Sequence, residues 1–248
     1  MLKRTAAFAA ALCIALACGG ALGMEAQTPA PQDAGLAPVQ PLSGERVWLR
    51  DGLSEGGTLS YRYPQFEAVT EADEAINAYY QALAKDMESL TEPVAAAIDF
   101  EITLNNDRYV SVVLTSVTQG GGGESVSLSA DTFARDGLYA GQPVSLSQVL
   151  GLEEEGELSD GDSEAERLAY EVVWRIVERD SQNADGDYLG GLTEEQVHSA
   201  FSPETDFYLD EDGNVVFFIQ AGEIAGEIAG VLRFPFAPAE LLSAVKAP

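Results

Sequence analysis

Residues 207–236, FYLDEDGNVVFFIQAGEIAGEIAGVLRFPF, decide the fold. The segment Glu211-Asp212-Gly213-Asn214 predicts a tight turn, because glycine accepts the positive φ that short hairpin turns need. The five consecutive apolar residues 215–219 predict a strand that is covered on both faces. An acidic link broken by glycines then leads to a closing strand, so the stretch predicts a hairpin followed by a third strand.

Strands and helices are interspersed in the rest of the chain. Capped apolar stripes predict a helix from Thr70 to about Leu90 and another from Ser163 to about Arg179. Alternating apolar residues predict strands, and shorter apolar stripes predict short helices. The expected strands lie near 47–49, 59–63, 100–104, 110–114 and 126–133, and the short helices near 193–201 and 241–245. We therefore expect an α+β fold in a single domain, with a largely antiparallel sheet packed against two main helices.

The composition limits the choice of partner. The chain has 248 residues, enough to bury a substantial core, and a formal charge of −28. Such a charge argues against nucleic acid, which needs Lys and Arg to neutralise its phosphates, and against anionic membrane surfaces. A cationic partner and simple solubility remain as explanations of the charge.

The N-terminus predicts secretion. Lys3 and Arg4 precede the short apolar run 5–17, and the small residues Ala21 and Gly23 stand at the two positions that a signal peptidase reads, as in a signal peptide covering 1–23. Its removal would leave 11 basic and 41 acidic residues, a charge of −30. The Ala- and Pro-rich segment 24–44 predicts a flexible linker, and the folded domain is expected over 45–248.

Cys18 offers a second processing route. It ends the sequence Ala15-Leu16-Ala17-Cys18, which is similar to the lipidation box of bacterial lipoproteins except that Ala15 stands where leucine is usual. Cys18 is therefore a candidate lipidation site, and a secreted protein and a lipoprotein both stay open. Because Cys13 and Cys18 both lie in this region, the folded part is expected to have no disulfide and no thiolate metal ligand.

The sequence predicts no catalytic residue, no metal site and no cofactor. His198 is the single histidine, and no Cys or G-x-S-x-G elbow accompanies it, so we expect a surface or helix-end residue. The segment 183–187, NADGD, is similar to part of a calcium loop. An EF-hand would place Ser181 and Leu192 at its first and twelfth ligand positions, where acids are needed, so the match fails.

Two glutamates are the candidate partner-binding residues. Glu223 and Glu227 come from the tandem sequence GEIA-GEIA, and the interleaved glycines favour a loop over a helix. Such a loop could present two carboxylates to a cationic partner. The alternative is a solvated link between two strands.

The expected domain over 45–248 resembles the RsiV-like domain family from about residue 55 to residue 240, and the most specific motifs lie in the C-terminal third. The family is that of the extracellular domain of the anti-sigma factor RsiV, which also accompanies PdaC-type deacetylases. The resemblance rests on an aromatic-led strand, an acidic-glycine turn, an aromatic strand, a Glu-Ile-Ala loop and a Pro-aromatic strand, here 207–209, 211–213, 216–218, 223–225 and 235–236. Gly222 and Glu227 stand where the family carries loop tyrosines, and the glycine run 120–123 lacks the family's histidine.

The resemblance implies an extracytoplasmic α+β domain, and in RsiV this domain binds lysozyme, a cationic protein. We therefore expect a non-catalytic binding domain of the bacterial cell envelope, whose partner is a cationic protein such as lysozyme or a wall-derived ligand. Membrane contact is expected only through a lipid anchor. The alternatives are a carboxylate-based enzyme acting on cell-wall glycan and a structural accessory module.

Overall fold

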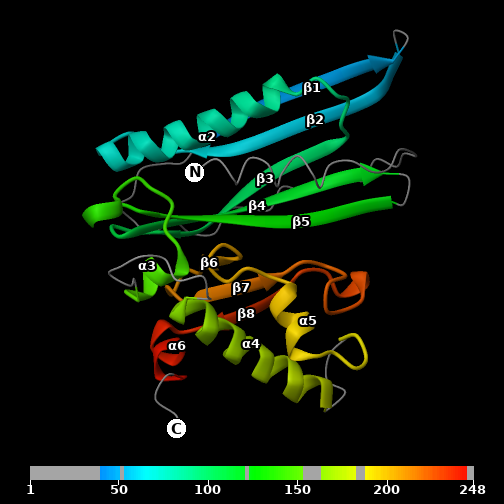
Figure 1. The fold of residues 1–248 in the computed structure, drawn as a ribbon. Coiled ribbons are helices and arrows are strands. Elements are labelled where there is room, and N and C mark those ends of the chain that lie inside the picture. Colours follow the sequence, from blue (N-terminus) through cyan, green and yellow to red (C-terminus); the bar gives the residue numbers. More distant parts are fainter. Residues whose placement is uncertain (1–39, 51–52, 121–122, 153–162, 183–187, 245–248) are drawn as a thin grey trace. The chain divides into compact units, whose positions relative to one another are not determined.

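The computed structural model describes residues 40–50, 53–120, 123–152, 163–182 and 188–244. Within them the chain forms eight strands and five α-helices, a mixed α+β fold in two mostly antiparallel sheets (Figure 1). The predicted fold class is confirmed, with two sheets in place of the one that was expected. The chain divides into two compact units, which are described one at a time.

The first unit contains β1 (Gln40–Arg50), β2 (Leu53–Gln65) and α2 (Glu71–Ser89). Strands β1 and β2 pair antiparallel, whereas β2 pairs in parallel with the start of β3 (Ala96–Asn105). The parallel pair is possible because α2 provides the long crossover between the two strands. Strand β1 begins at Gln40, inside the segment 24–44 that was predicted to be a linker.

Tyrosines form the core of this unit. Tyr61 and Tyr63 of β2 and Tyr80 of α2 are buried, with ring centroids 5.5 Å apart for Tyr61 and Tyr63 and 5.9 Å apart for Tyr63 and Tyr80. The Tyr61 hydroxyl donates a hydrogen bond to Glu88 Oε1 at 2.8 Å. Tyr80, on the buried face of α2, therefore packs in the core.

The five-stranded sheet continues from β3 through β4 (Tyr109–Gly120) to β5 (Gly123–Ala134), which is its edge strand. On that edge, the side-chain amide of Gln220 bonds the backbone of Leu128 twice. The Leu128 N–H donates to Gln220 Oε1 at 3.0 Å, and Gln220 Nε2 donates to the Leu128 carbonyl at 2.8 Å. A side chain thus takes the hydrogen bonds that another strand would make at this point.

The second unit contains a three-stranded antiparallel sheet with β7 (Val215–Ile219) between β6 (Phe207–Leu209) and β8 (Leu232–Phe236). All five residues of β7 are buried, as predicted from the apolar run. Helix α4 (Glu164–Gln182) lies beside this sheet (Figure 1), and its apolar face contributes to the same core. The residues of α4 that are buried there are Ala165, Leu168, Ala169, Val172, Val173 and Val177.

The turn between β6 and β7 is closed by Asp210. Its Oδ1 accepts from the backbone N–H of Asp212 at 3.0 Å and of Asn214 at 2.8 Å, and Gly213 has a φ of 78°. These contacts are those of an Asp-led turn that needs glycine at the left-handed position, so the predicted hairpin is confirmed.

Three short helices complete the second unit: α3 (Leu146–Leu150), α5 (Glu194–Ser199) and α6 (Pro238–Ala244). Capping boxes fix the starts of α3 and α5, through Ser145 with Gln148 and Thr193 with Gln196. Two single 3-10 turns, η1 (Gly137–Tyr139) and η2 (Glu227–Ala229), lie in connections.

Several predictions fall on other parts of the chain. The predicted signal peptide, Cys18 and the segment 183–187 lie outside the described residues. Within the described ranges, no helix combines the length and the apolar character needed to cross a membrane. The same ranges hold no group of three His, Cys, Asp or Glu side chains placed to bind a metal ion.

Candidate functional site

The link between β7 and β8 carries the two GEIA copies, and the structure places them differently. In the first copy Ile224 is 0% exposed and Ala225 is buried as well. In the second copy, which forms η2, Ile228 is 97% exposed. One copy therefore belongs to the core and the other to the surface.

Hydrogen bonds hold this loop at its base and at its tip. At the base, the Leu189 N–H donates to the Ile224 carbonyl at 2.9 Å, and Tyr188 forms an antiparallel bridge with Ala225. At the tip, the Ala229 N–H donates to the Gly226 carbonyl at 2.9 Å. The loop thus has a defined backbone in both copies.

The two candidate residues, Glu223 and Glu227, are both exposed on this loop. A Cβ at Gly222 would lie 3.4 Å from Glu227 Cγ, so the Glu227 side chain folds back beside the residue that precedes Glu223. Gly222 also has a φ of 85°, which strains any other L-residue. The structure therefore brings the two glutamates to one small region, as the predicted loop requires. Their role in binding stays a prediction.

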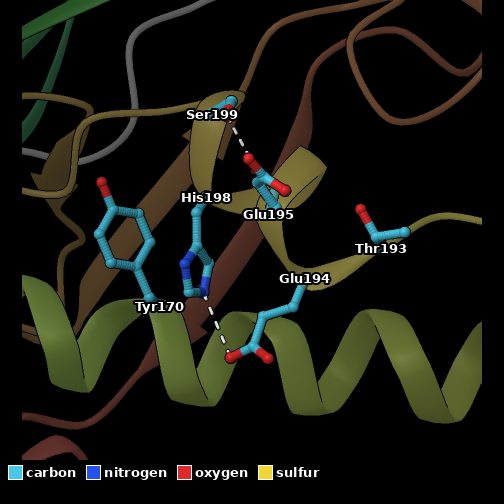
Figure 2. Close-up of a pocket in the computed structure, with 6 residues that line it drawn as sticks. All are labelled: Tyr170, Thr193, Glu194, Glu195, His198 and Ser199. Atoms are coloured by element: carbon cyan, nitrogen blue, oxygen red, sulfur yellow. Dashed lines mark hydrogen bonds and ion pairs between the residues drawn. The ribbon is translucent and has the colours of Figure 1, made fainter.

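A hollow of about 560 Å³ lies beside helix α5 (Figure 2). The residues that line it are Tyr170, Thr193, Glu194, Glu195, His198 and Ser199. His198 lies in the last turn of α5, as expected for a helix-end histidine, and its ring stacks on Tyr170 with the centroids 4.3 Å apart. Its Nε2 lies 3.6 Å from Glu194 Oε1.

The polar groups of this hollow are engaged with one another and with the helix. The Ser199 hydroxyl donates to the Glu195 carbonyl at 2.8 Å, away from the imidazole (Figure 2). The Thr193 hydroxyl caps the start of α5 by accepting from the Gln196 N–H. A hydroxyl nucleophile would need to contact the base that activates it, and the hollow offers no such pair among its lining residues.

A further carboxylate, Glu204, was not predicted from the sequence. It accepts a hydrogen bond from the Ser147 N–H at 3.0 Å, from the Ser163 hydroxyl at 2.6 Å and from the Ser147 hydroxyl. Burial raises the pKa of the Glu204 carboxyl, but the hydrogen bonds from Ser147 and Ser163 outweigh burial and bring the pKa below its ordinary value.

Glu204 is therefore a structural group that joins the starts of two helices. Ser147 lies in the first turn of α3 and Ser163 immediately precedes α4. A carboxylate is stabilised at helix N-termini by the unpaired N–H groups there. The local sequence around Glu204 gives no signal for this role, because its partners lie 57 and 41 residues earlier in the chain.

Comparison with known proteins supports the fold. No protein-family profile matches the sequence, and no curated protein matches it either. A crystal structure of a DUF3298 family member from Bacteroides fragilis NCTC 9343 is similar, with a TM-score of 0.54 and 12% sequence identity. The likeness covers 85% of this chain and 94% of that one.

A second DUF3298 family protein, from Pseudomonas aeruginosa PAO1, aligns with a TM-score of 0.47 and 14% identity over 84% of this chain and 93% of its own. The likeness to the Bacteroides protein shows that this chain shares a DUF3298-type α+β fold over most of its length.

Proposed function

We propose that this chain is an extracytoplasmic, non-catalytic binding domain of the bacterial cell envelope. Its partner is a cationic protein such as lysozyme or a wall-derived ligand. The observation that carries the proposal is the loop between β7 and β8, where Glu223 and Glu227 are exposed on a backbone that is hydrogen-bonded at its base and at its tip. Pre-ordered charged groups bind without the entropy cost of ordering them first.

Three further observations support this proposal. The formal charge of −28 favours association with cationic surfaces. The sequence resemblance to the RsiV-like family implies a binding role outside the membrane, and the likeness to a DUF3298 fold is compatible with it. The predicted signal peptide directs the chain to the same compartment.

The hollow beside α5 does not favour the alternative of a glycan-cleaving enzyme. Such an enzyme needs two carboxyl groups on opposite sides of the scissile bond. In the hollow, Glu194 is directed to His198, and Glu195 comes from the same short helix (Figure 2).

Binding is tested by calorimetry on the chain without residues 1–23, titrated separately with lysozyme and with soluble muropeptides. We expect binding to one of them that weakens as ionic strength rises, because salt screens charge attraction. Glu223→Gln with Glu227→Gln should weaken it. Glu67→Gln with Glu74→Gln, two exposed acids in the first unit, makes the same charge change elsewhere.

The two double variants distinguish binding through the loop glutamates from binding through the net charge of the chain. Equal weakening in both double variants would mean that net charge acts and the loop does not. Binding of neither lysozyme nor muropeptides would remove the proposed function and leave the structural accessory module.

The proposed location is tested at Cys18. We expect a precursor that either incorporates labelled fatty acid, with Cys18→Ser abolishing the label, or is cleaved after residue 23 and released. A protein that stays in the cytoplasm at its full length contradicts both routes.

A further inference from the structure

The two GEIA copies show that the exposure of Ile228 is not forced by its sequence. Ile224, in the same four-residue sequence, is fully buried, whereas Ile228 is 97% exposed. Single exposed apolar residues are common on protein surfaces. Here, however, the exposed side chain sits on a bonded turn, since the backbone of η2 is closed at Ala229 and at Gly230, whose N–H donates to the Glu227 carbonyl at 3.0 Å.

Exposed apolar and acidic side chains both occur on this loop and on the segment that bonds its base. Six large apolar side chains are exposed in the described residues, and two of them, Leu189 and Ile228, belong to this loop and to the segment that bonds its base. Glu227 directly precedes Ile228, and Glu223 belongs to the other copy. An aliphatic tip with acidic neighbours is complementary to an apolar depression with a basic rim.

We infer that Ile228 is the apolar anchor of this loop and inserts into an apolar pocket on a cationic protein, where Glu223 and Glu227 contact the basic rim. The inference rests on the proposed function and narrows its partner to a protein. A wall polysaccharide offers neither an aliphatic pocket nor a basic rim, so it would leave both features of the loop unused.

Ile228 and the two glutamates then act on different steps of binding. Exposed charges mainly speed the encounter and make it sensitive to salt. A side chain buried at the centre of a contact mainly slows dissociation. Ile228 should therefore control the dissociation rate, and the two glutamates the association rate.

The test is surface plasmon resonance on the chain without residues 1–23, with immobilised lysozyme and, as a second cationic protein, cytochrome c. Ile228→Ser should raise the dissociation rate about tenfold and leave the salt dependence of association unchanged. Glu223→Gln with Glu227→Gln should lower the association rate instead. Leu138→Ser is the matched control, because Leu138 is also an exposed apolar residue in a single 3-10 turn, and it should change neither rate.

Two outcomes would overturn the inference while the proposed binding function stands. One is an Ile228→Ser variant that dissociates from lysozyme and from cytochrome c no faster than the wild type. The other is a wild-type chain that binds muropeptides and neither cationic protein. Circular dichroism of each variant confirms that the fold is kept, as expected for an exposed position.

Discussion

Glu204 shows how one side chain can fix the starts of two helices. Its carboxylate accepts hydrogen bonds from Ser147, in the first turn of α3, and from Ser163, which immediately precedes α4. A glutamine at this position keeps one oxygen acceptor and loses the charge. We therefore expect Glu204→Gln to lower the free energy of unfolding by about 1–3 kcal/mol, because hydrogen bonds to a charged group are lost. Urea denaturation at pH 7 measures this, with the exposed Glu178→Gln on α4 as the control.

The same residue predicts a pH dependence. The pKa of the Glu204 carboxyl is lowered from 4.5 in the folded state, so its stabilisation is present above about pH 4.5 and is lost as the pH falls through the lower folded-state pKa. The stability difference between wild type and Glu204→Gln should therefore shrink on acidification. A difference that stays constant from pH 7 to pH 3 would contradict this role.

Tyr61 predicts a pH dependence of stability in the opposite direction, with a contribution that is lost at high pH. Burial, the hydrogen bond to Glu88 and the charge of Glu88 raise the pKa of the Tyr61 phenol from 10.0 to about 12. The neutral hydroxyl therefore stabilises the fold fully below pH 10, and this contribution is lost as the pH rises through about 12.

We expect Tyr61→Phe to cost about 1 kcal/mol at pH 7, the usual value of one hydrogen bond, and to cost less above pH 10. Unfolding of both proteins across this pH range, with Glu88→Gln as the partner variant, measures the effect. An undiminished cost near pH 12 would show that the hydroxyl is not the group involved.

At the scale of elements, Gln220 joins the edge strand β5 to the segment that follows β7. Its amide serves both the N–H and the carbonyl of Leu128, which lies 92 residues earlier. Gln220→Ala should lower the free energy of unfolding by about 1–3 kcal/mol, because two backbone groups lose their partners. It should also speed amide exchange at Leu128.

A graded control is available at the same site. Gln220→Glu keeps the acceptor for the Leu128 N–H but has no donor for the Leu128 carbonyl. It should therefore speed amide exchange at Leu128 less than Gln220→Ala does. Unchanged exchange at Leu128 in both variants would mean that other contacts protect this edge.

The elements were predicted well where their signals are local. The β6–β7 turn follows from Asp-Gly, and α2 and α4 begin next to Thr70 and Ser163, as their capping sequences predict. Local periodicity does not say which strands pair, however. The parallel pairing of β2 with β3 and the division into two sheets depend on contacts distant in sequence, as do the bonds of Gln220 and Glu204.

The candidate loop was predicted in position but not in detail. Three glycines around Glu223 and Glu227 indicate a loop, and both acids are exposed on it. Identical tetrapeptides carry identical local signals, so the sequence could not show that Ile224 is buried and Ile228 exposed. The first copy pairs with a separate segment, through the bridge of Ala225 with Tyr188, and such a pairing cannot be predicted from the tetrapeptide alone.

At the scale of the whole molecule, charge is the dominant property. With a formal charge of −28, like charges repel one another across the folded chain. Because salt screens such repulsion, we expect the melting temperature at pH 7 to rise between about 20 mM and 500 mM NaCl. Scanning fluorimetry measures this, with Na₂SO₄ of equal ionic strength to separate screening from ion-specific effects. A melting temperature that falls with NaCl would show that attractive ion pairs outweigh the repulsion.

The tandem GEIA loop also affects which sequence changes this protein can accept during evolution. Ile224 and Ala225 are constrained by the core, whereas residues 226–229 add little buried surface of their own. A four-residue repeat of this kind can be gained or lost in one slippage event during DNA replication. The sheet formed by β6, β7 and β8 would keep its pairing after such an event. The second copy is therefore where the protein can vary its surface while the first preserves the fold.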